Sequence, residues 1–455
     1  MPDFLVFIDE LLALHPLEAF WRLFLRGGWI SLVYLAIATW YKYRLNHLRR
    51  KHERSIQFIL LAIDIPKDIE PNLKAVEQIF AHFAGIKTTL TFWDRYWLGK
   101  IEDHLSLEII SVDGYIQFLI RTPDYFRDMV EAAVYAQYPE AQITQVDDYT
   151  IGAPRTFPDT DYEVWGTEFR FRRADAYPIR TYPNFEYGLT QTLADPMASI
   201  LEILSRITRG EQLWLQLVIE PAEDAWRERG ERIVKKLIGA RVEGGGRFDA
   251  LAYWPRQVGK GLFESATASV LTPQPESVKE ERQEPPSKVQ FLSPGDRAIV
   301  ESMQMKMSKI GFLTSFRFVY LAPREIFSKE RVVNGVVGAL SQFTVEDMNG
   351  FKRSKYYTTK KPTIRGAQRY AAKQHRIMRR YVYRWPPEEG SAIVLNTEEL
   401  ASLFHFPTES VKAPLVKKME AKRGEPPVGL PTDRMPFPRP LPESDAAGPP
   451  ENLPL

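Results

Sequence analysis

An apolar stretch close to the start of the chain limits the possible folds more than any other feature. The run from Gly27 to Tyr41 has no charged residue and spans about 22 Å as a helix, or about 28 Å when counted from Leu23. That length approaches the ~30 Å hydrocarbon core of a bilayer. The charge of Arg26 can reach the membrane surface by snorkelling. The stretch therefore predicts one transmembrane helix from Leu23 to Tyr41.

The residues around this stretch set its expected orientation. Trp29, Trp40 and Tyr41 are placed to act as interfacial membrane anchors. The basic residues that follow predict a single-pass membrane protein with its bulk in the cytoplasm: Lys42, Arg44, Arg49, Arg50, Lys51 and Arg54. Residues 4–14 form an amphipathic pattern suited to the membrane interface. Two other interpretations stay open, namely a cleaved signal peptide and a buried helix of a soluble protein.

Composition and motifs narrow the chemistry. The 455 residues include no cysteine, which excludes disulfides, zinc–thiolate sites, iron–sulfur clusters and cysteine nucleophiles. No GxxxxGK[ST] phosphate loop, dinucleotide fingerprint or Gly-x-Ser-x-Gly elbow occurs, and the seven histidines form no pair at helical spacing. The carboxylate pairs Asp147-Asp148 and Glu398-Glu399 fit structural positions. We therefore predict a non-enzymatic protein with no catalytic residues, no metal ligands and no cofactor.

Residues 55–150, after an N-terminal region of residues 1–54, have the pattern of an α/β domain. Strands are expected at 56–65, 105–111, 115–121 and 141–146, and helices at 71–84 and 123–138. Asp113-Gly114 marks a hairpin turn between the two central strands. The succession β-α-β-β-α-β is the split βαβ arrangement of ferredoxin-like folds.

Residues 151–423 predict a second ferredoxin-like domain with a long insertion. Strands are expected at 162–172, 212–219 and 312–321, and helices at 195–208, 221–238, 294–310 and 323–342. Residues of about 240–290 are polar and Pro-rich and are predicted to be a mobile insertion. Residues 393–404 predict a strand, an Asn-Thr helix cap and a helix. The Pro-rich residues 424–455 predict a disordered tail. The strands and helices expected in the two regions give an α+β fold class.

The strongest local signal is the basic stretch of residues 352–384, which has no Asp or Glu and has tyrosines between its cations. Cations among aromatic rings suit single-stranded nucleic acid, through phosphate contacts and base stacking. A solvated helix face, or a surface for an acidic protein or the anionic leaflet, is the structural alternative. The residues predicted to contact nucleic acid are Arg369, Lys373, Arg376, Arg379, Arg380, Tyr381 and Tyr383.

Three segments carry a family resemblance. They are LEIISVDGYIQFLIRTPDYFRDMVEAAVYAQYPEAQITQVDDYT at 107–150, LNTEELASLFHFP at 395–407 and GEPPVGLP at 424–431. They resemble the N-terminal region of bacterial conjugation-type (type IV secretion, HerA-like) ATPases. The resemblance covers roughly residues 20–431 and implies a membrane helix and an α/β region ahead of a RecA-like motor. Its motifs have no known chemical role, so it supplies no catalytic residue, and the chain ends where the motor would begin.

These observations predict a non-enzymatic, membrane-anchored subunit of a type IV secretion or conjugation-like apparatus for DNA or protein transfer. Its expected partners are the inner membrane, a separate P-loop motor ATPase or sister subunits, and single-stranded DNA, and an oligomer is expected. The alternative is a membrane-tethered protein that binds single-stranded nucleic acid and has no role in secretion. An enzyme with an unrecognised site is the third interpretation.

Overall fold

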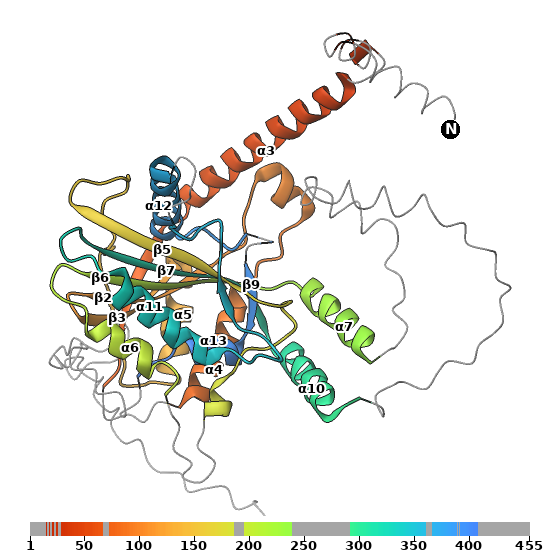
Figure 1. The fold of residues 1–455 in the computed structure, drawn as a ribbon. Helices are drawn as coiled ribbons and strands as arrows, with labels where there is room; N and C mark the ends of the chain where they lie inside the picture. The colour runs from red at the N-terminus through yellow and green to blue at the C-terminus, as the bar shows by residue number, and fades with distance from the viewer. Residues whose placement is uncertain are drawn as a thin grey trace, which may run out of the picture. The chain divides into compact units, whose positions relative to one another are not determined.

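The structure is a computed structural model (Figure 1). It describes residues 29–66, 72–185, 195–238, 292–360, 366–388, 390 and 392–407, together with residues 15, 18, 21, 24 and 25. Three predictions lie outside these residues: the amphipathic segment at 4–14, the mobile insertion at about 240–290 and the disordered tail at 424–455.

The elements of the first half follow the predicted order, with ends shifted by a few residues. After the long helix α3 (Trp29–Ser55), the strands and longer helices are β1 (Phe58–Asp64), α4 (Leu73–Phe83), β2 (Leu105–Val112), β3 (Tyr115–Pro123), α5 (Arg127–Tyr135) and β4 (Gln142–Gln145). The short helical turns are η2 (Ala84–Ile86), η3 (Asp94–Leu98) and η4 (Asp124–Phe126).

The second half has a similar alternation, with two helices between its second and third strands, and adds three elements at its end. It contains β5 (Tyr162–Phe171), α6 (Ala198–Ser205), β6 (Gln212–Pro221), α7 (Ala225–Leu237), α10 (Pro294–Ser308), β7 (Gly311–Pro323), α11 (Lys329–Leu340) and β8 (Phe351–Arg353). The last elements are α12 (Gly366–Val382), β9 (Ile393–Asn396) and α13 (Thr397–Leu403). The short turns here are η5 (Tyr182–Phe185) and η8 (Ser341–Phe343).

The described strands form one antiparallel sheet of nine strands in the order β4-β1-β3-β2-β6-β7-β5-β8, with β9 paired to β7. Read from its outer edge, each half has the same order: its fourth strand, first strand, third strand and second strand. The second strands meet at the centre, where β2 pairs with β6 from Leu105↔Ile219 to Val112↔Gln212. The two predicted α/β regions therefore share one sheet.

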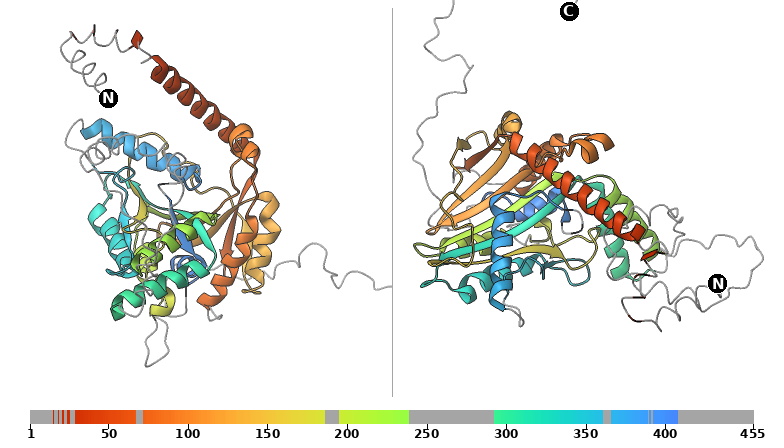
Figure 2. Two further views of the ribbon diagram at one scale, coloured as in Figure 1. Left: turned by 90° about the vertical axis from the view of Figure 1, so that its right-hand side faces the viewer. Right: turned by 90° about the horizontal axis from the view of Figure 1, so that it is seen from above.

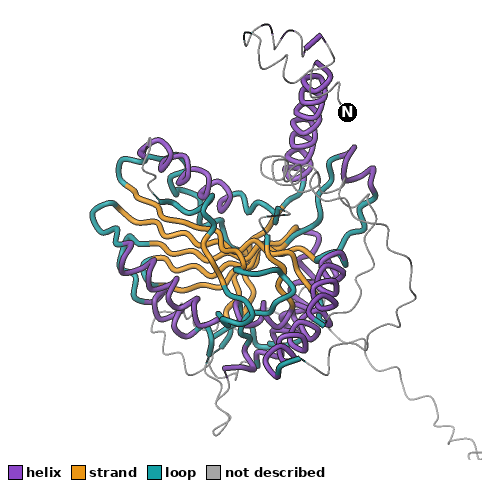
Figure 3. Tube along the Cα trace, turned by 45° about the vertical axis from the view of Figure 1, so that its right-hand side comes forward, coloured by secondary structure: helices purple, strands orange, loops and turns teal. Residues whose placement is uncertain are grey.

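Helices cover both faces of this sheet (Figure 3). The main hydrophobic core lies on the face covered by α4, α5, α6, α11 and α13, and it includes Leu107 of the first half and Phe316 of the second. On the opposite face α12 crosses the strands and contacts β5 and β7 (Figure 2). A smaller cluster packs α7 against α10.

Local sequence signals explain where several elements begin and end. Asp113 and Gly114 both have positive φ angles, of 55° and 87°, as the predicted two-residue hairpin turn requires. The predicted helix cap at residues 396–397 is confirmed, because Asn396 and Glu399 form a reciprocal capping box at the start of α13. Ser293 caps α10 by accepting a hydrogen bond from Asp296 N, and Pro294 follows at the first position of the helix.

The predicted transmembrane helix from Leu23 to Tyr41 is not found in the structure. Among the residues described, no helix combines the length and the apolar content that crossing a membrane requires. The uncharged part of α3 runs from Trp29 to Tyr41, which is 13 residues or about 20 Å. Lys42 and Arg44 follow on the same helix, and residues 26–28 lie outside the described part of the chain.

Candidate functional site

Four polar side chains form a row across the centre of the sheet. Glu108 of β2 lies opposite Gln216 of β6, Gln216 lies opposite Arg317 of β7, and Arg317 lies opposite Glu168 of β5. Each is 0 % exposed. Side chains alternate between the faces of a sheet, and their chain neighbours enter the main core. The four therefore face α12, and we call them the charge row.

Hydrogen bonds connect the charge row from end to end. Gln216 Nε2 donates to Glu108 Oε1 at 3.0 Å, and Arg317 Nη1 donates to Gln216 Oε1 at 3.0 Å. Arg317 Nε donates to Glu168 Oε2 at 3.3 Å. The row thus joins a strand of the first half to three strands of the second half.

Two arginines at the C-terminal end of α12 and just after it pair with the carboxylates of the charge row. Arg380 Nε donates to Glu168 Oε2 at 3.2 Å, and Arg384 Nε donates to Glu108 Oε1 at 3.0 Å. Arg384 also pairs with Asp148, so one member of the Asp147-Asp148 pair has the predicted structural role. Arg384 has a φ of 47°, the left-handed conformation common just after a helix end.

Backbone carbonyl groups at this helix end complete the network. Arg317 Nη1 donates to Arg380 O at 3.2 Å and its Nη2 donates to Trp385 O at 2.6 Å. Gln216 Nε2 donates to Tyr381 O at 3.2 Å. Arg380 O and Tyr381 O also accept backbone hydrogen bonds from Trp385 N and Arg384 N. The carbonyl groups at a helix end carry partial negative charge, which favours a second bond from a buried guanidinium.

Aromatic rings pack around the end of the charge row that Glu108 forms. The Tyr381 ring stacks on Trp214 with centroids 5.2 Å apart, and Tyr149 packs edge-on against Trp214 at 5.3 Å. Tyr149 donates its hydroxyl hydrogen to Glu108 Oε2 at 2.7 Å, and the Tyr149 and Tyr381 hydroxyl groups lie 2.8 Å apart. Burial raises the pKa of both tyrosines well above the ordinary value, so both hydroxyls stay protonated.

The charges of the row depend on one another. Burial opposes the ionisation of Glu108, but the charge of Arg384 and its hydrogen bonds outweigh burial, so the pKa of Glu108 lies below its ordinary value. Burial also lowers the pKa of Arg317 to about 10, against the attraction of Glu168. At neutral pH both arginines and Glu108 are therefore ionised, which makes each one costly to leave unpaired.

The structure corrects two of the predicted nucleic-acid contacts. Arg380 is 2 % exposed and pairs with Glu168, and Tyr381 is 0 % exposed and packs against Trp214 and Tyr149, so neither is available to a nucleic acid. The physical reason is helical geometry: α12 turns these two side chains toward the sheet, whereas Arg379 and Tyr383 face solvent.

The other predicted contacts lie on the outer side of α12. Arg369, Arg379 and Tyr383 are exposed, while Lys373 and Arg376 are partly exposed. The Arg376 guanidinium lies over the Tyr356 ring, 4.1 Å from its centroid, and Lys373 Nζ donates to Lys355 O at 3.2 Å. These contacts join α12 to the segment after β8. We call this set the α12 basic surface: Lys355, Tyr356, Arg369, Lys373, Arg376, Arg379 and Tyr383.

The predicted membrane anchors lie on α3. Trp29 and Trp40 are exposed, whereas Tyr41 is partly buried and donates its hydroxyl hydrogen to Tyr96 O at 3.1 Å. Sequence reasoning missed the segment that Tyr41 contacts, which we call the aromatic turn and which comprises residues 92–98 (FWDRYWL). The sequence does contain a signal for this segment, because four aromatic residues fall within six positions.

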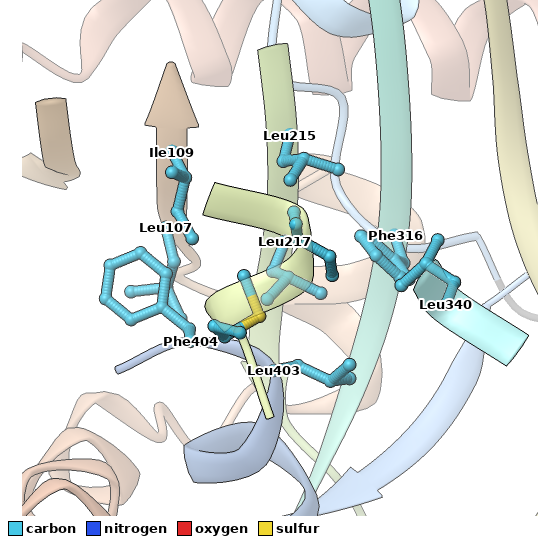
Figure 4. A pocket seen from close by; sticks show the side chains of 10 residues that line it. Leu107, Ile109, Leu215, Leu217, Phe316, Leu340, Leu403 and Phe404 are labelled. Atoms are coloured by element: carbon cyan, nitrogen blue, oxygen red, sulfur yellow. The ribbon is translucent and has the colours of Figure 1, made fainter. Parts of the chain in front are cut away.

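The main core contains a small apolar cavity rather than a ligand pocket. Its volume is about 10 Å³, and Leu107, Leu217 and Phe404 are among the side chains that line it (Figure 4). A cavity of this size has room for about one water molecule. Within the described ranges, no group of three or more His, Asp or Glu side chains could hold a metal ion.

Fold and site together define an α+β protein with one continuous antiparallel sheet and a helix held on it by buried charges. The chain belongs to the family described as Domain of unknown function (DUF8128), which matches residues 74–419. This region includes the charge row, α12 and the aromatic turn, while α3 and β1 precede it. No curated protein matches the chain.

Replacing Arg384 by Ala should lower the free energy of unfolding by about 3–5 kcal/mol, because the buried Glu108 carboxylate loses the cation that pairs with it. The matched control is Arg379→Ala, five positions earlier and exposed, which should change it by less than about 0.5 kcal/mol. Urea titrations followed by circular dichroism measure both. A loss below about 1 kcal/mol for Arg384→Ala would mean that the charge row does not hold α12.

The low pKa of Glu108 predicts sensitivity to acid. Its stabilising effect is fully present above its ordinary value of 4.5 and is lost as pH falls below 4.5 through its lowered folded pKa. Burial raises the pKa values of Glu399 and Asp175, which opposes this trend in every variant alike. Urea titrations between pH 7 and pH 3 should therefore show a steeper loss of stability in the wild type than in Glu108→Gln. The exposed-pair variant Glu202→Gln should keep the wild-type slope, and equal slopes for all three would refute the assignment.

Proposed function

We propose that this protein is a non-enzymatic, membrane-anchored subunit of a type IV secretion or conjugation-like transfer apparatus that docks a separate motor ATPase. The observation that carries the proposal is the first half of α3. Its large apolar side chains are exposed: Trp29, Ile30, Leu32, Val33, Tyr34, Leu35, Ile37 and Trp40. At 100° per residue these positions point in every direction around the helix.

A helix that is apolar on all sides needs a surrounding apolar phase. A helix lying along a membrane surface would have a polar side, which this half of α3 lacks. Insertion of the helix end into the bilayer fits better, because about 20 Å of uncharged helix is enough to pass through one leaflet of a ~30 Å core. The basic second half of α3 would then meet the anionic headgroups of the cytoplasmic leaflet of the inner membrane.

The remaining parts of the proposal have separate support. The polar side chains of the charge row are bonded to one another and buried, which supports a structural role for them rather than a catalytic one. The strand order of each half supports two ferredoxin-like units that share the β2–β6 edge. The resemblance to conjugation-type ATPases supports docking of a P-loop motor, or of sister copies of this chain.

A second candidate function rests on the α12 basic surface. Four of its cations (Arg369, Lys373, Arg376 and Arg379) lie on one helix at spacings of three and four residues, and two tyrosines accompany them. The charge row holds this helix in place, so the cations have a fixed arrangement. That arrangement favours binding of single-stranded DNA at the membrane.

Membrane fractionation followed by affinity purification tests the leading proposal. The full chain should be found in the membrane fraction and should co-purify in detergent with a polypeptide that carries GxxxxGK[ST]. Replacing Leu32 and Leu35 by Glu should move the protein to the soluble fraction, because two charges in the apolar core each cost about 2.5 kcal/mol or more. The control Met305→Glu, on the exposed side of α10, should stay with the membranes. Soluble wild-type protein without such a partner would refute the proposal.

Single-stranded DNA should bind the α12 basic surface weakly and with a steep salt dependence. Replacing Arg369, Arg376 and Arg379 by Ala should reduce the slope of log affinity against log salt by ~0.7 for each phosphate that is no longer neutralised. Tyr383→Ala should weaken binding because a base can no longer stack on that ring. The matched control removes three exposed arginines elsewhere: Arg206, Arg232 and Arg297. Equal losses of affinity in both triple variants, or no binding at low salt, would eliminate the second candidate.

A further inference from the structure

The aromatic turn exposes side chains that proteins usually bury. Phe92 is 77 % exposed, Trp93 is 58 % exposed and Trp97 is 51 % exposed. The rings are arranged in two neighbouring pairs: Phe92 with Tyr96 at 4.7 Å, and Trp93 stacked on Trp97 at 4.8 Å. Such a concentration of exposed aromatic surface indicates a contact with something outside the chain.

The turn is built to hold these rings in place. Thr91 Oγ1 donates to Asp94 Oδ2 at 2.6 Å, and Lys100 Nζ pairs with Asp94 Oδ1 at 2.8 Å. Gly99 ends the turn with a φ of +70°, a conformation that side chains other than glycine rarely adopt. Arg95 forms ion pairs on the other side of the turn. The rings are therefore exposed on a fixed scaffold.

The position of the turn along α3 suggests what it contacts. Tyr96 accepts the hydrogen bond from Tyr41, and the Arg44 guanidinium lies 4.9 Å from the Trp97 ring centroid. A Cβ atom added to Gly99 would lie 2.5 Å from Leu48 Cβ, so the two backbones approach closely there. The turn thus packs beside residues 41–48, where the apolar half of α3 gives way to its basic half.

This level on the helix is where a membrane surface would lie if the apolar half of α3 inserts. Trp and Tyr side chains favour the headgroup region, because their rings are amphipathic. The nearby cations suit anionic lipid: Lys42, Arg44, Arg49, Arg50 and Lys51. A two-fold contact of this surface with a second copy would bring the same positive charges together, so the charge favours an anionic bilayer as the partner.

We propose that the aromatic turn is a second membrane contact, whose rings enter the headgroup region of an anionic bilayer beside α3. This inference rests on the membrane anchoring proposed above. Two attachment points, rather than one helix alone, would set the tilt of the sheet relative to the membrane. The turn also lies within the family region at 74–419, whereas α3 lies outside it.

Flotation of the full-length protein with vesicles tests this assignment. Vesicles of phosphatidylcholine with and without phosphatidylglycerol are used, and lipids brominated near the headgroup serve as quenchers of tryptophan fluorescence. The wild type should bind anionic vesicles more tightly and show quenching. The double variant Trp93→Ser with Trp97→Ser should bind about tenfold more weakly, the change expected from burial of part of two ring surfaces. It should also lose the part of the quenching that comes from the turn, whereas Trp29 and Trp40 of α3 should still be quenched, and its circular dichroism should stay unchanged.

A matched double variant removes exposed apolar side chains elsewhere, by Tyr115→Ser with Ile151→Ser, and should bind like the wild type. The variant Leu32→Glu with Leu35→Glu separates the two proposals. If wild-type protein does not float, membrane anchoring itself fails. The role of the turn alone is refuted by a different outcome. In that outcome the wild type floats, the Leu variant does not float, and the Trp variant floats and is quenched as strongly as the wild type. Loss of a dimer in the Trp variant with unchanged lipid binding would instead assign the turn to a second copy and overturn the inference.

Discussion

The cost of burying charge is the constraint on which the rest of this structure depends. Glu108, Glu168 and Arg317 lie in the interior of the molecule, between the sheet and α12, with no exposed surface. An ion removed from water loses several kcal/mol of hydration even after the protein relaxes around it. Pairing offsets that loss, and the pairing partners lie on four strands and at the end of one helix. Glu168 Oε1 and Arg380 Nη2 are the atoms of the network that have no hydrogen-bond partner in the described part of the chain. The network is satisfied only when both halves of the sheet and α12 are all in place.

This requirement explains how α12 is oriented. Two arginines, a tyrosine and several backbone carbonyl groups lie at its end or just after it, and each of them contacts the charge row or the rings beside it. Rotation of the helix would bury Arg376 or Arg379 and leave Glu168 without Arg380, one of its two cations. The same pairing that directs Arg380 inward therefore directs the α12 basic surface outward. The α3 helix and the aromatic turn are held by a separate set of contacts around residues 41–48, so the two surfaces are built independently.

Much of the secondary structure could be predicted because its signals are local. The Asp113-Gly114 turn, the Asn396 cap and the alternation in β2 and β3 depend on residues a few positions apart. The stretch at 352–384 was recognisable as a basic surface for the same reason. Its division was not predictable: the nine-residue run from Arg376 to Arg384 includes both exposed and fully buried cations. Which ones turn inward depends on carboxylates more than 200 positions away in the chain.

Sequence by itself determined the class of fold, the β-α-β-β-α-β succession of the first half, most elements of the second half and the apolar-then-basic pattern of α3. These follow from periodicity, caps and turns, which act within a few residues. Sequence did not predict β8. Only the tertiary structure decided that β2 pairs with β6. Either strand could have been a solvated edge of its own sheet, because backbone hydrogen bonds do not depend on side-chain identity. The tertiary structure also decided that Glu108, Gln216, Arg317 and Glu168 align. Their alignment depends on the register of three strand pairs, which is set by the packing of the whole sheet.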